Sequence, residues 1–375
     1  VEVPMKRRCA WLFEALLEGC SYEALRRMRY SLLAEKGGTS VILHDANAYP
    51  DDLVSDEELA ALHAGFCPRI EDVLGSHCTA IDGVWGLRFV VWAPRAQLVS
   101  VVGDFNGWDG RAHPMRRRLA SGNGAFTGLW ELFLPCGTKR MDVPFGSKYM
   151  FKIKGVDGVD RNKIDPFAQE FEAPPKYASV VSACDDSFSE SPYKWGDAAW
   201  LARRAALGKG DKLRRQAMAI YEVHLPSWRR SGEGEVLKYR DVAPMLVEHM
   251  KAMHFNYLEL LPLAQHPFPG SWGYQVTGHY AAYSSLGTPD DFKHFVDTMH
   301  QAGIGVIMDY VPAHFCKDDW ALVNYDGSAT FEYEDPREGE HSEWGTKAFN
   351  FKRSEVRAYL IGVPLFWIER YHVDG

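Results

Sequence analysis

The sequence predicts a multidomain protein with N-terminal helices, then a β-sandwich, then an α/β part built on parallel strands. Three observations support this prediction. The chain has 375 residues, more than one ordinary domain holds. Hydrophobic residues alternate with a period of two over about residues 83–183. From residue 219 onward, short apolar runs alternate with amphipathic helix patterns.

Residues 1–65 are predicted to form a helical N-terminal segment. Residues 1–36 are interpreted as two short helices, punctuated by Gly19 and Ser21 and ended by the Gly-Gly pair at 37–38. Ser55 and Glu58 have the spacing of a capping box, which predicts a further helix over about 56–64. We therefore expect a helical segment ahead of the sandwich.

The next predicted domain is a β-sandwich within residues 66–185. Apolar residues occupy alternate positions in two clear runs, which are Leu87, Phe89 and Val91 and then Tyr149, Phe151 and Ile153. Turn clusters at 103–110, 122–124 and 155–158 separate the runs, a spacing typical of a sandwich. Residues 186–218 contain polar turns and a basic helical segment, and they are predicted to be a linker.

Residues 219–375 are predicted to alternate strands with helices. Strands are expected at 219–225, 257–263 and 305–311, and helices at 236–254 and 289–301. Thr288 is the expected N-cap of the second helix, Pro289 its first residue and Gly303 its stop. A long loop over 312–350 follows, and then a helix that Ser354 is expected to cap and that runs to about Tyr371. This order predicts parallel strands with right-handed crossovers, and polar, aromatic loops follow the strand ends where parallel barrels build active sites.

Composition argues against several classes of function. The formal charge of −8 argues against a nucleic-acid binder. The seven cysteines are scattered without a C-x-x-C pair, so we expect no disulfide framework, no zinc site and a reducing compartment. No apolar run reaches transmembrane length, so no membrane partner is expected. Metalloprotease, nucleophile-elbow and phosphate-loop motifs do not occur, and we predict no cofactor and no metal.

Both halves of the chain carry long motifs that resemble one enzyme family. Those of the second half include YEVHLPSWRR (221–230), ELLPLAQHPFPGSWGYQVTGHY (259–280), HQAGIGVIMDYVPAHF (300–315), EWGTKAFNF (343–351) and LFWIERYHVDG (365–375). Those of the first half include FVVWAPRAQLVSVVGDFNGWDGRAHPM (89–115) and KIDPFA (163–168). Over about residues 66–375 the chain resembles the bacterial-type 1,4-α-glucan (glycogen) branching enzymes of the α-amylase superfamily. It departs from their pattern at Pro226, Gln265 and Pro364.

The resemblance implies a carbohydrate-binding sandwich followed by the first part of a TIM (β/α)8 barrel, truncated after about three strands. It implies an enzyme that cuts an α-1,4 glucan chain and transfers it to a 6-hydroxyl. The implied partners are α-glucans such as glycogen, amylose and amylopectin, and the implied compartment is the cytoplasm, or a plastid if a transit peptide is missing. The family's nucleophilic Asp and acid Glu would lie beyond Gly375, and Asp374 is not that nucleophile by motif register, so this chain is expected to be inactive alone.

Four residues match or accompany the family's sugar site. Tyr274 matches an aromatic that stacks on the sugar ring, and Asp309 matches a carboxylate that organises the same subsite. His314 matches a residue that hydrogen-bonds a sugar hydroxyl, and Trp272 is expected to support these contacts. Without the motif, Asp309 and His314 would be interpreted as ordinary loop residues. Two alternatives stay open: a non-catalytic α-glucan-binding protein, and another superfamily enzyme such as a debranching enzyme.

Overall fold

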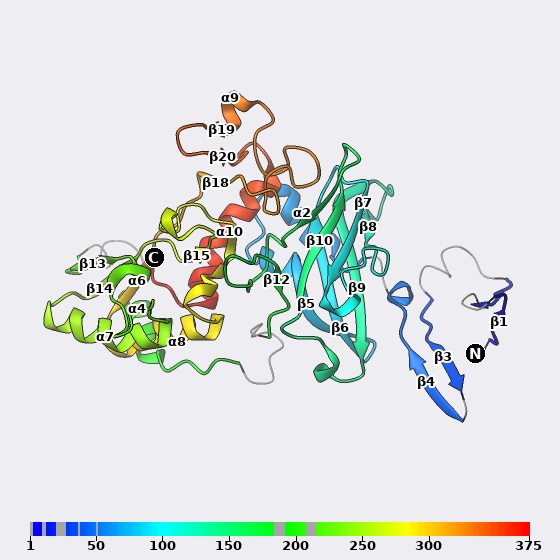
Figure 1. Cartoon of the computed structure of the whole chain (residues 1–375), viewed down its shortest axis with the longest axis horizontal. Helices are drawn as coiled ribbons and strands as arrows, with labels where there is room; N and C mark the ends of the chain where they lie inside the picture. The colour runs from blue at the N-terminus through cyan, green and yellow to red at the C-terminus, as the bar shows by residue number, and fades with distance from the viewer. Residues whose placement is uncertain are drawn as a thin grey trace. The chain divides into compact units, whose positions relative to one another are not determined.

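The structure is a computed structural model that describes residues 3–9, 13–19, 28–36, 38–49, 52–183, 192–207 and 215–375. Its internal contacts group the chain into two units, Val1–Pro50 and Asp51–Gly375 (Figure 1). The finer boundaries predicted at 65/66, 185/186 and 218/219 fall inside the second unit and stay predictions. None of the described helices is both long and apolar enough to cross a membrane.

The described residues of the first unit form short antiparallel strands, followed by a 3-10 turn at Ala46–Ala48, so the two helices predicted over residues 1–36 are wrong there. β1 (Lys6–Arg7) pairs with β2 (Phe13–Glu14), and β3 (Leu32–Lys36) pairs with β4 (Thr39–Leu43). Lys36 lies opposite Thr39, and Gly38 turns the chain with a φ of +81°, so Gly38 lies in a hairpin turn and not at a helix end. Thr39, Val41 and Ile42 are β-branched and favour this strand. Residues 1–2, 10–12 and 20–27 of the predicted helices lie outside the described residues.

The second unit begins with the predicted helix and then the predicted sandwich. α2 (Asp56–Ala64) starts at the capping box of Ser55 and Glu58, and the short α3 (Ile70–Val73) follows. One sheet has the order β5-β6-β9-β8, and in the other β10 pairs with β7, β11 and β12. The bounds are β5 (Gly75–Ile81), β6 (Val84–Trp92), β7 (Leu98–Gly103), β8 (Arg116–Leu119), β9 (Phe126–Gly137), β10 (Lys148–Lys154), β11 (Asp160–Lys163) and β12 (Ser179–Val180).

Packing between the two sheets follows the predicted alternation. Phe89 of β6 meets Tyr149 and Phe151 of β10, with ring centroids 5.3 and 6.4 Å apart. The sandwich starts earlier than the predicted residue 83, because β5 forms a hairpin with β6. Asp82 and Gly83 turn that hairpin with φ values of 51° and 78°, as a type I′ turn requires.

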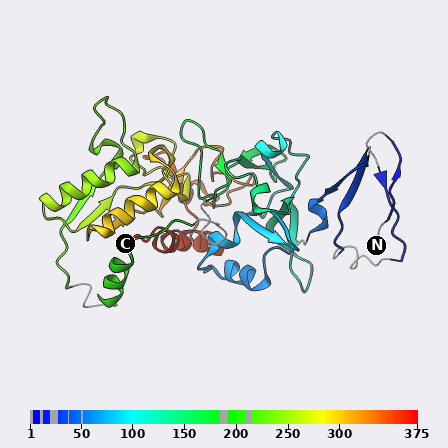
Figure 2. The same cartoon turned by 90° about the horizontal axis from the view of Figure 1, so that it is seen from below.

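A parallel three-stranded sheet with the order β13-β14-β17 follows, as predicted. β13 (Ile220–Val223), β14 (Tyr257–Leu260) and β17 (Gly305–Met308) are each shorter than expected. α7 (Tyr239–Ala252) and α8 (Pro289–Gln301) lie side by side along the sheet (Figure 2), and α8 has its predicted Thr288 cap. The backbone N–H of Asp374 donates to the Val306 carbonyl at 2.8 Å, and the backbone N–H of Met308 donates to the Gly375 carbonyl at 2.9 Å. The last residues therefore run beside β17.

Residues 312–350, predicted as a loop, contain regular structure. β18 (His314–Cys316), β20 (Thr346–Ala348) and β19 (Glu340–His341) form an antiparallel sheet in that order, with α9 (Pro336–Gly339) beside it. We name residues 312–350 the lobe; it is the orange segment of Figure 1. The strands are only two or three residues long, which explains why their pattern is hard to find in the sequence.

The helix α10 (Ser354–Arg370) connects the parts of the second unit. It continues through Pro364 without a break, and Arg353, not Ser354, occupies its N-cap position. It packs against α2, α3 and the strand β16 (Gly278–Ala282). Tyr359 on α10 is fully buried, and its ring contacts Phe167 of the sandwich region, Tyr280 of β16, and Phe331 and Phe349 of the lobe. One aromatic cluster therefore joins the sandwich, the α/β part and the lobe.

A buried lysine strengthens the same junction. Lys163 at the end of β11 donates from Nζ to the carbonyls of Asp319 and Val323 in the lobe. Burial lowers the pKa of Lys163 to about 8. The backbone N–H of Ile164 donates a hydrogen bond to the backbone carbonyl of Trp320 at 2.9 Å, so main-chain hydrogen bonds also connect the sandwich and the lobe. This bonding explains why both belong to one compact unit.

His279 makes the stability of this core depend on pH. It is buried on β16, where Nδ1 meets the Tyr359 hydroxyl at 2.9 Å. Burial, aided by nearby His314, lowers the pKa of His279 from 6.5 to about 3. Between these values the unfolded chain binds a proton that the folded chain does not. The stability contribution of His279 should therefore fall as the pH drops from about 6.5 toward 3, by about 1.4 kcal/mol per pH unit.

Urea unfolding of the native chain and a His279→Asn variant between pH 4 and 8 measures this effect. The variant loses the titrating group, so its stability should change less steeply below pH 6.5. Equal slopes for both proteins would show that another group causes the acid sensitivity.

Candidate functional site

Tyr274 and Asp309 form the centre of the candidate site. Asp309 directly follows β17, and Tyr274 lies in the loop between β15 (Ala264–Gln265) and β16. The Tyr274 hydroxyl donates to Asp309 Oδ2 at 2.6 Å. Burial, this hydrogen bond and the nearby carboxylates of Glu222 and Glu259 raise the pKa of Tyr274 to about 12. The phenol therefore stays protonated and donates its hydrogen bond at neutral pH.

The Tyr274 loop is fixed against the end of β14 by its backbone. Gly273 has a φ of +90°, and a Cβ there would come within 2.0 Å of the Pro262 carbonyl oxygen. Only glycine allows such a close approach of two backbones. Trp272 just before it also has a positive φ, and its side chain is 58% exposed. The loop therefore presents Trp272 and Tyr274 from a constrained base.

His314 lies beside Tyr274, at the start of the lobe. Its Nε2 lies 2.9 Å from the Tyr274 carbonyl oxygen, and its Nδ1 is enclosed without a partner among the described residues. Burial lowers the pKa of His314, the bond to the Tyr274 carbonyl opposes this, and nearby His341 lowers it further. The imidazole of His314 is accordingly neutral at pH 7. Its Nε2–H donates a hydrogen bond to the Tyr274 carbonyl oxygen.

The four predicted site residues occupy one region. Hydrogen bonds link Tyr274 directly to Asp309 and, through its carbonyl, to His314. Trp272 does not join this network; its ring faces His224 after β13, with centroids 5.8 Å apart. A flat ring, a carboxylate and a neutral imidazole are groups that can hold a sugar by stacking and directional hydrogen bonds. Their roles toward a sugar stay predictions.

Two further residues of this region were not singled out from the sequence. Trp344 and His341 of the lobe approach His314, with ring centroids 5.4 and 6.0 Å away. Trp344 belongs to the EWG motif, but only the pairing of β18 with β20 shows that it lies near His314. Within the described ranges, no three His, Cys, Asp or Glu side chains are arranged to hold a metal ion.

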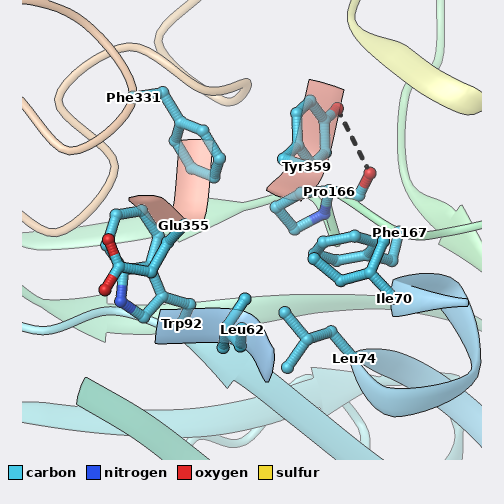
Figure 3. A pocket seen from close by; sticks show the side chains of 9 residues that line it. All are labelled: Leu62, Ile70, Leu74, Trp92, Pro166, Phe167, Phe331, Glu355 and Tyr359. Carbon is cyan, nitrogen blue, oxygen red and sulfur yellow. Dashed lines mark hydrogen bonds between the residues drawn. The ribbon is translucent and has the colours of Figure 1, made fainter. Parts of the chain in front are cut away.

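A small pocket elsewhere in the second unit has a different character (Figure 3). It lies between α2, α3, α10 and the sandwich, and apart from Glu355 its lining is apolar or aromatic: Leu62, Ile70, Leu74, Trp92, Pro166, Phe167, Phe331 and Tyr359. Glu355 is engaged, because His63 Nδ1 lies 2.8 Å from its carboxylate. With few polar groups to bond hydroxyls, this pocket is a gap in the core packing and not the candidate site.

A buried polar network surrounds Asp374, next to Val306 of β17. Asp374 accepts hydrogen bonds from Trp200 and Arg204 of α4 (Ala198–Leu207), at 3.0 and 2.9 Å. It also accepts from the Val306 backbone at 2.8 Å and meets His300 Nε2 at 3.0 Å. Asp197 in turn meets His300 and His372. Residues 192–207 of the predicted linker are thereby held against the α/β part.

Comparison with known proteins defines the class first. Residues 73–168 match the model of carbohydrate-binding module 48, the isoamylase N-terminal domain. The fold of the chain resembles that of pullulanase from Bacillus acidopullulyticus, with a TM-score of 0.59, 16% identity, and 91% of this chain and 40% of that chain covered. The chain thus contains a β-sandwich of the carbohydrate-binding module 48 type, followed by a parallel β/α segment consistent with the start of a TIM barrel, as predicted.

Sequence comparison identifies the particular relatives. The chain is 45% identical to 1,4-alpha-glucan branching enzyme GlgB of Methylococcus capsulatus over 88% of its own length and 42% of that enzyme. It is 44% identical to the GlgB of Myxococcus xanthus over 100% of its length and 48% of that enzyme. The chain is therefore a homologue of the N-terminal part of bacterial 1,4-alpha-glucan branching enzymes, and it spans less than half the length of these relatives.

Proposed function

We propose that this chain takes part in α-glucan branching, as the N-terminal part of a 1,4-α-glucan branching enzyme. The sandwich binds α-glucans such as glycogen, amylose or amylopectin. The loops after β14 and β17 hold one glucose unit at the position of bond cleavage. The observation that carries this proposal is the hydrogen bond from Tyr274 to Asp309, because it places a rigid aromatic face beside a carboxylate at the end of a parallel strand.

Each residue has a distinct proposed role. The Tyr274 ring stacks on one face of the pyranose, and the Asp309 oxygen not facing Tyr274 accepts from a sugar hydroxyl. His314 hydrogen-bonds a second hydroxyl, which requires its ring to exchange its bond with the Tyr274 carbonyl for one with the sugar. Trp272 is exposed on the same loop as Tyr274, and its proposed role is to shield the bound sugar ring from water.

In the whole enzyme, two carboxyl groups about 5 Å apart would perform the reaction. One attacks the anomeric carbon and the other protonates the leaving oxygen. The 6-hydroxyl of a second glucan then displaces the enzyme carboxylate and forms the branch. By the family resemblance, neither carboxyl group has a counterpart in residues 1–375. The proposed contribution of this chain is therefore binding and orientation of the donor glucan, in the cytoplasm.

A Tyr274→Ala variant tests the proposed sugar site. It removes the stacking surface, so we expect the dissociation constant for maltotriose to rise about tenfold or more. Isothermal titration of the 375-residue chain measures it. Tyr274→Phe keeps the ring, loses only the bond to Asp309, and should bind within a few-fold of native. Unchanged binding in Tyr274→Ala would remove the site from this loop.

Iodine staining of amylose separates the alternatives. The 375-residue chain should retard in a glycogen-containing gel and leave the amylose–iodine spectrum unchanged. A spectral shift with purified chain would show that it carries its own catalytic groups. Absence of retardation with glycogen, amylopectin and amylose alike would argue against both the branching enzyme and the non-catalytic glucan binder. Release of linear chains from amylopectin would favour a debranching enzyme.

A further inference from the structure

We propose that Trp344 and His341 form an additional glucose subsite, which extends the site at Tyr274 along the glucan. This inference rests on the proposed function and adds a second binding surface from a different part of the chain. Residues of the lobe would then determine how strongly affinity depends on the length of the glucan.

The Trp344 ring is accessible to solvent and lies beside two histidine rings. It is 58% exposed, and its ring contacts are with His341 at 5.2 Å and His314 at 5.4 Å between centroids. An exposed tryptophan with two imidazole rings beside it offers a flat apolar surface together with hydrogen-bonding groups. A glucose unit has the matching chemistry, because its C–H face is apolar and its edge carries hydroxyls.

The position of Trp344 is fixed by the lobe. It lies in the turn between β19 and β20, where its backbone N–H donates to the His341 carbonyl at 3.1 Å and Gly345 has a φ of +66°. β20 pairs with β18, which begins at His314. Glu340 forms ion pairs with both Lys317 and Lys347 and clamps the three strands together. A surface held in this way needs little ordering when a ligand binds, which favours affinity.

His314 joins the two surfaces. It hydrogen-bonds the Tyr274 carbonyl on one side and meets the Trp344 ring on the other. A glucan whose one unit stacks on Tyr274 can therefore extend toward Trp344, because His314 contacts both the Tyr274 backbone and the Trp344 ring. Trp344 and Tyr274 come from separate loops, so each can be changed without altering the other's backbone.

The chain-length dependence of binding tests this inference. Titration of the 375-residue chain with maltose, maltotriose and maltopentaose is compared for native protein, Trp344→Ala, Trp344→Phe and Tyr274→Ala. In Trp344→Ala we expect roughly a tenfold rise in the dissociation constant for maltopentaose and less than a twofold change for maltose. Trp344→Phe should recover most of the maltopentaose affinity. Any glucan site on the sandwich is the same in all four proteins. Differences between their dissociation constants therefore report on the substituted residues.

The two proposals fail in different ways. If Tyr274→Ala weakens every sugar and Trp344→Ala changes none, the subsite at Trp344 is overturned and the proposed function survives. If Trp344→Ala weakens maltose as much as maltopentaose, Trp344 acts on the same unit as Tyr274 and no additional subsite exists. If Tyr274→Ala has no effect on any sugar, the proposed site itself is wrong. Equal melting temperatures of native and variant proteins check that each variant is folded.

Discussion

An Asp374→Ala variant is expected to lose about 3–5 kcal/mol of unfolding free energy. The carboxylate is the shared acceptor for Trp200, Arg204 and the Val306 backbone, and it contacts His300. Its removal leaves the partly exposed Arg204 guanidinium and several donors around the buried carboxylate without their acceptor. The cost comes from these unpaired groups more than from the lost attraction itself.

Urea unfolding at pH 7 measures this loss. Asp160→Ala is the matched control, because Asp160 is exposed and only its ion pair with Lys152 is lost, which should cost less than about 1 kcal/mol. Arg204→Ala combined with Asp374→Ala should cost less than the sum of the single changes, since one network is removed twice. Additive losses, or a loss in Asp374→Ala no larger than in the control, would contradict the network's role.

The same carboxylate predicts a pH dependence. Burial alone would raise the pKa of Asp374, but hydrogen bonds from His300, Trp200 and Val306 outweigh it and hold that pKa below the usual 3.8. The unfolded chain therefore binds a proton first as the pH falls. The stabilisation from Asp374 is fully present above about pH 4 and is lost as the pH falls through the folded pKa.

The second large effect is expected for Tyr359→Ala, which should lower the unfolding free energy by about 3–5 kcal/mol. The fully buried ring contacts aromatic residues of the sandwich region, of β16 and of the lobe, and its loss leaves a cavity where the three meet. We also expect the sandwich and the α/β part to unfold less cooperatively in this variant, because α10 is their shared element.

Tyrosine fluorescence, far-ultraviolet circular dichroism and limited proteolysis across a urea series test both expectations. Tyr359→Phe keeps the ring and removes the hydroxyl that meets His279, so it should cost only about 1–3 kcal/mol. A loss below 1 kcal/mol in Tyr359→Ala, with coincident transitions by all probes, would show that the junction does not depend on this ring.

Local patterns predicted the regular parts of the chain well. The helix over 289–301 could be placed to the residue because Thr288 and Pro289 mark its start, and the helix over 56–64 because Ser55 and Glu58 cap it. The three parallel strands were found because each lies in a mainly apolar run and is separated from the next by a helix-length segment. Their ends were overestimated, because apolar residues continue beyond the last ladder hydrogen bond.

Other elements depended on distant pairing. The N-terminal strands were mistaken for helices because stretches such as Leu32–Lys36 are composed of residues that favour helix, and only pairing with Thr39–Leu43 makes them strands. The lobe was taken for a loop because its strands are too short to show a period. The segment at 192–207 gave no sign of its attachment to Asp374, since Trp200 and Arg204 lie more than 165 positions away in the chain.

The sequence by itself determined the order of sandwich and parallel α/β part and the residues Tyr274, Asp309, His314 and Trp272 as candidates, because caps, strand periods and motifs are local properties. Only the tertiary structure decided that Tyr274 bonds Asp309, that Trp344 stands beside His314, and that Asp374 is the centre of a buried network. These are contacts between residues 30 to 174 positions apart. Such contacts arise from burial and pairing across the folded chain, which no short stretch of sequence encodes.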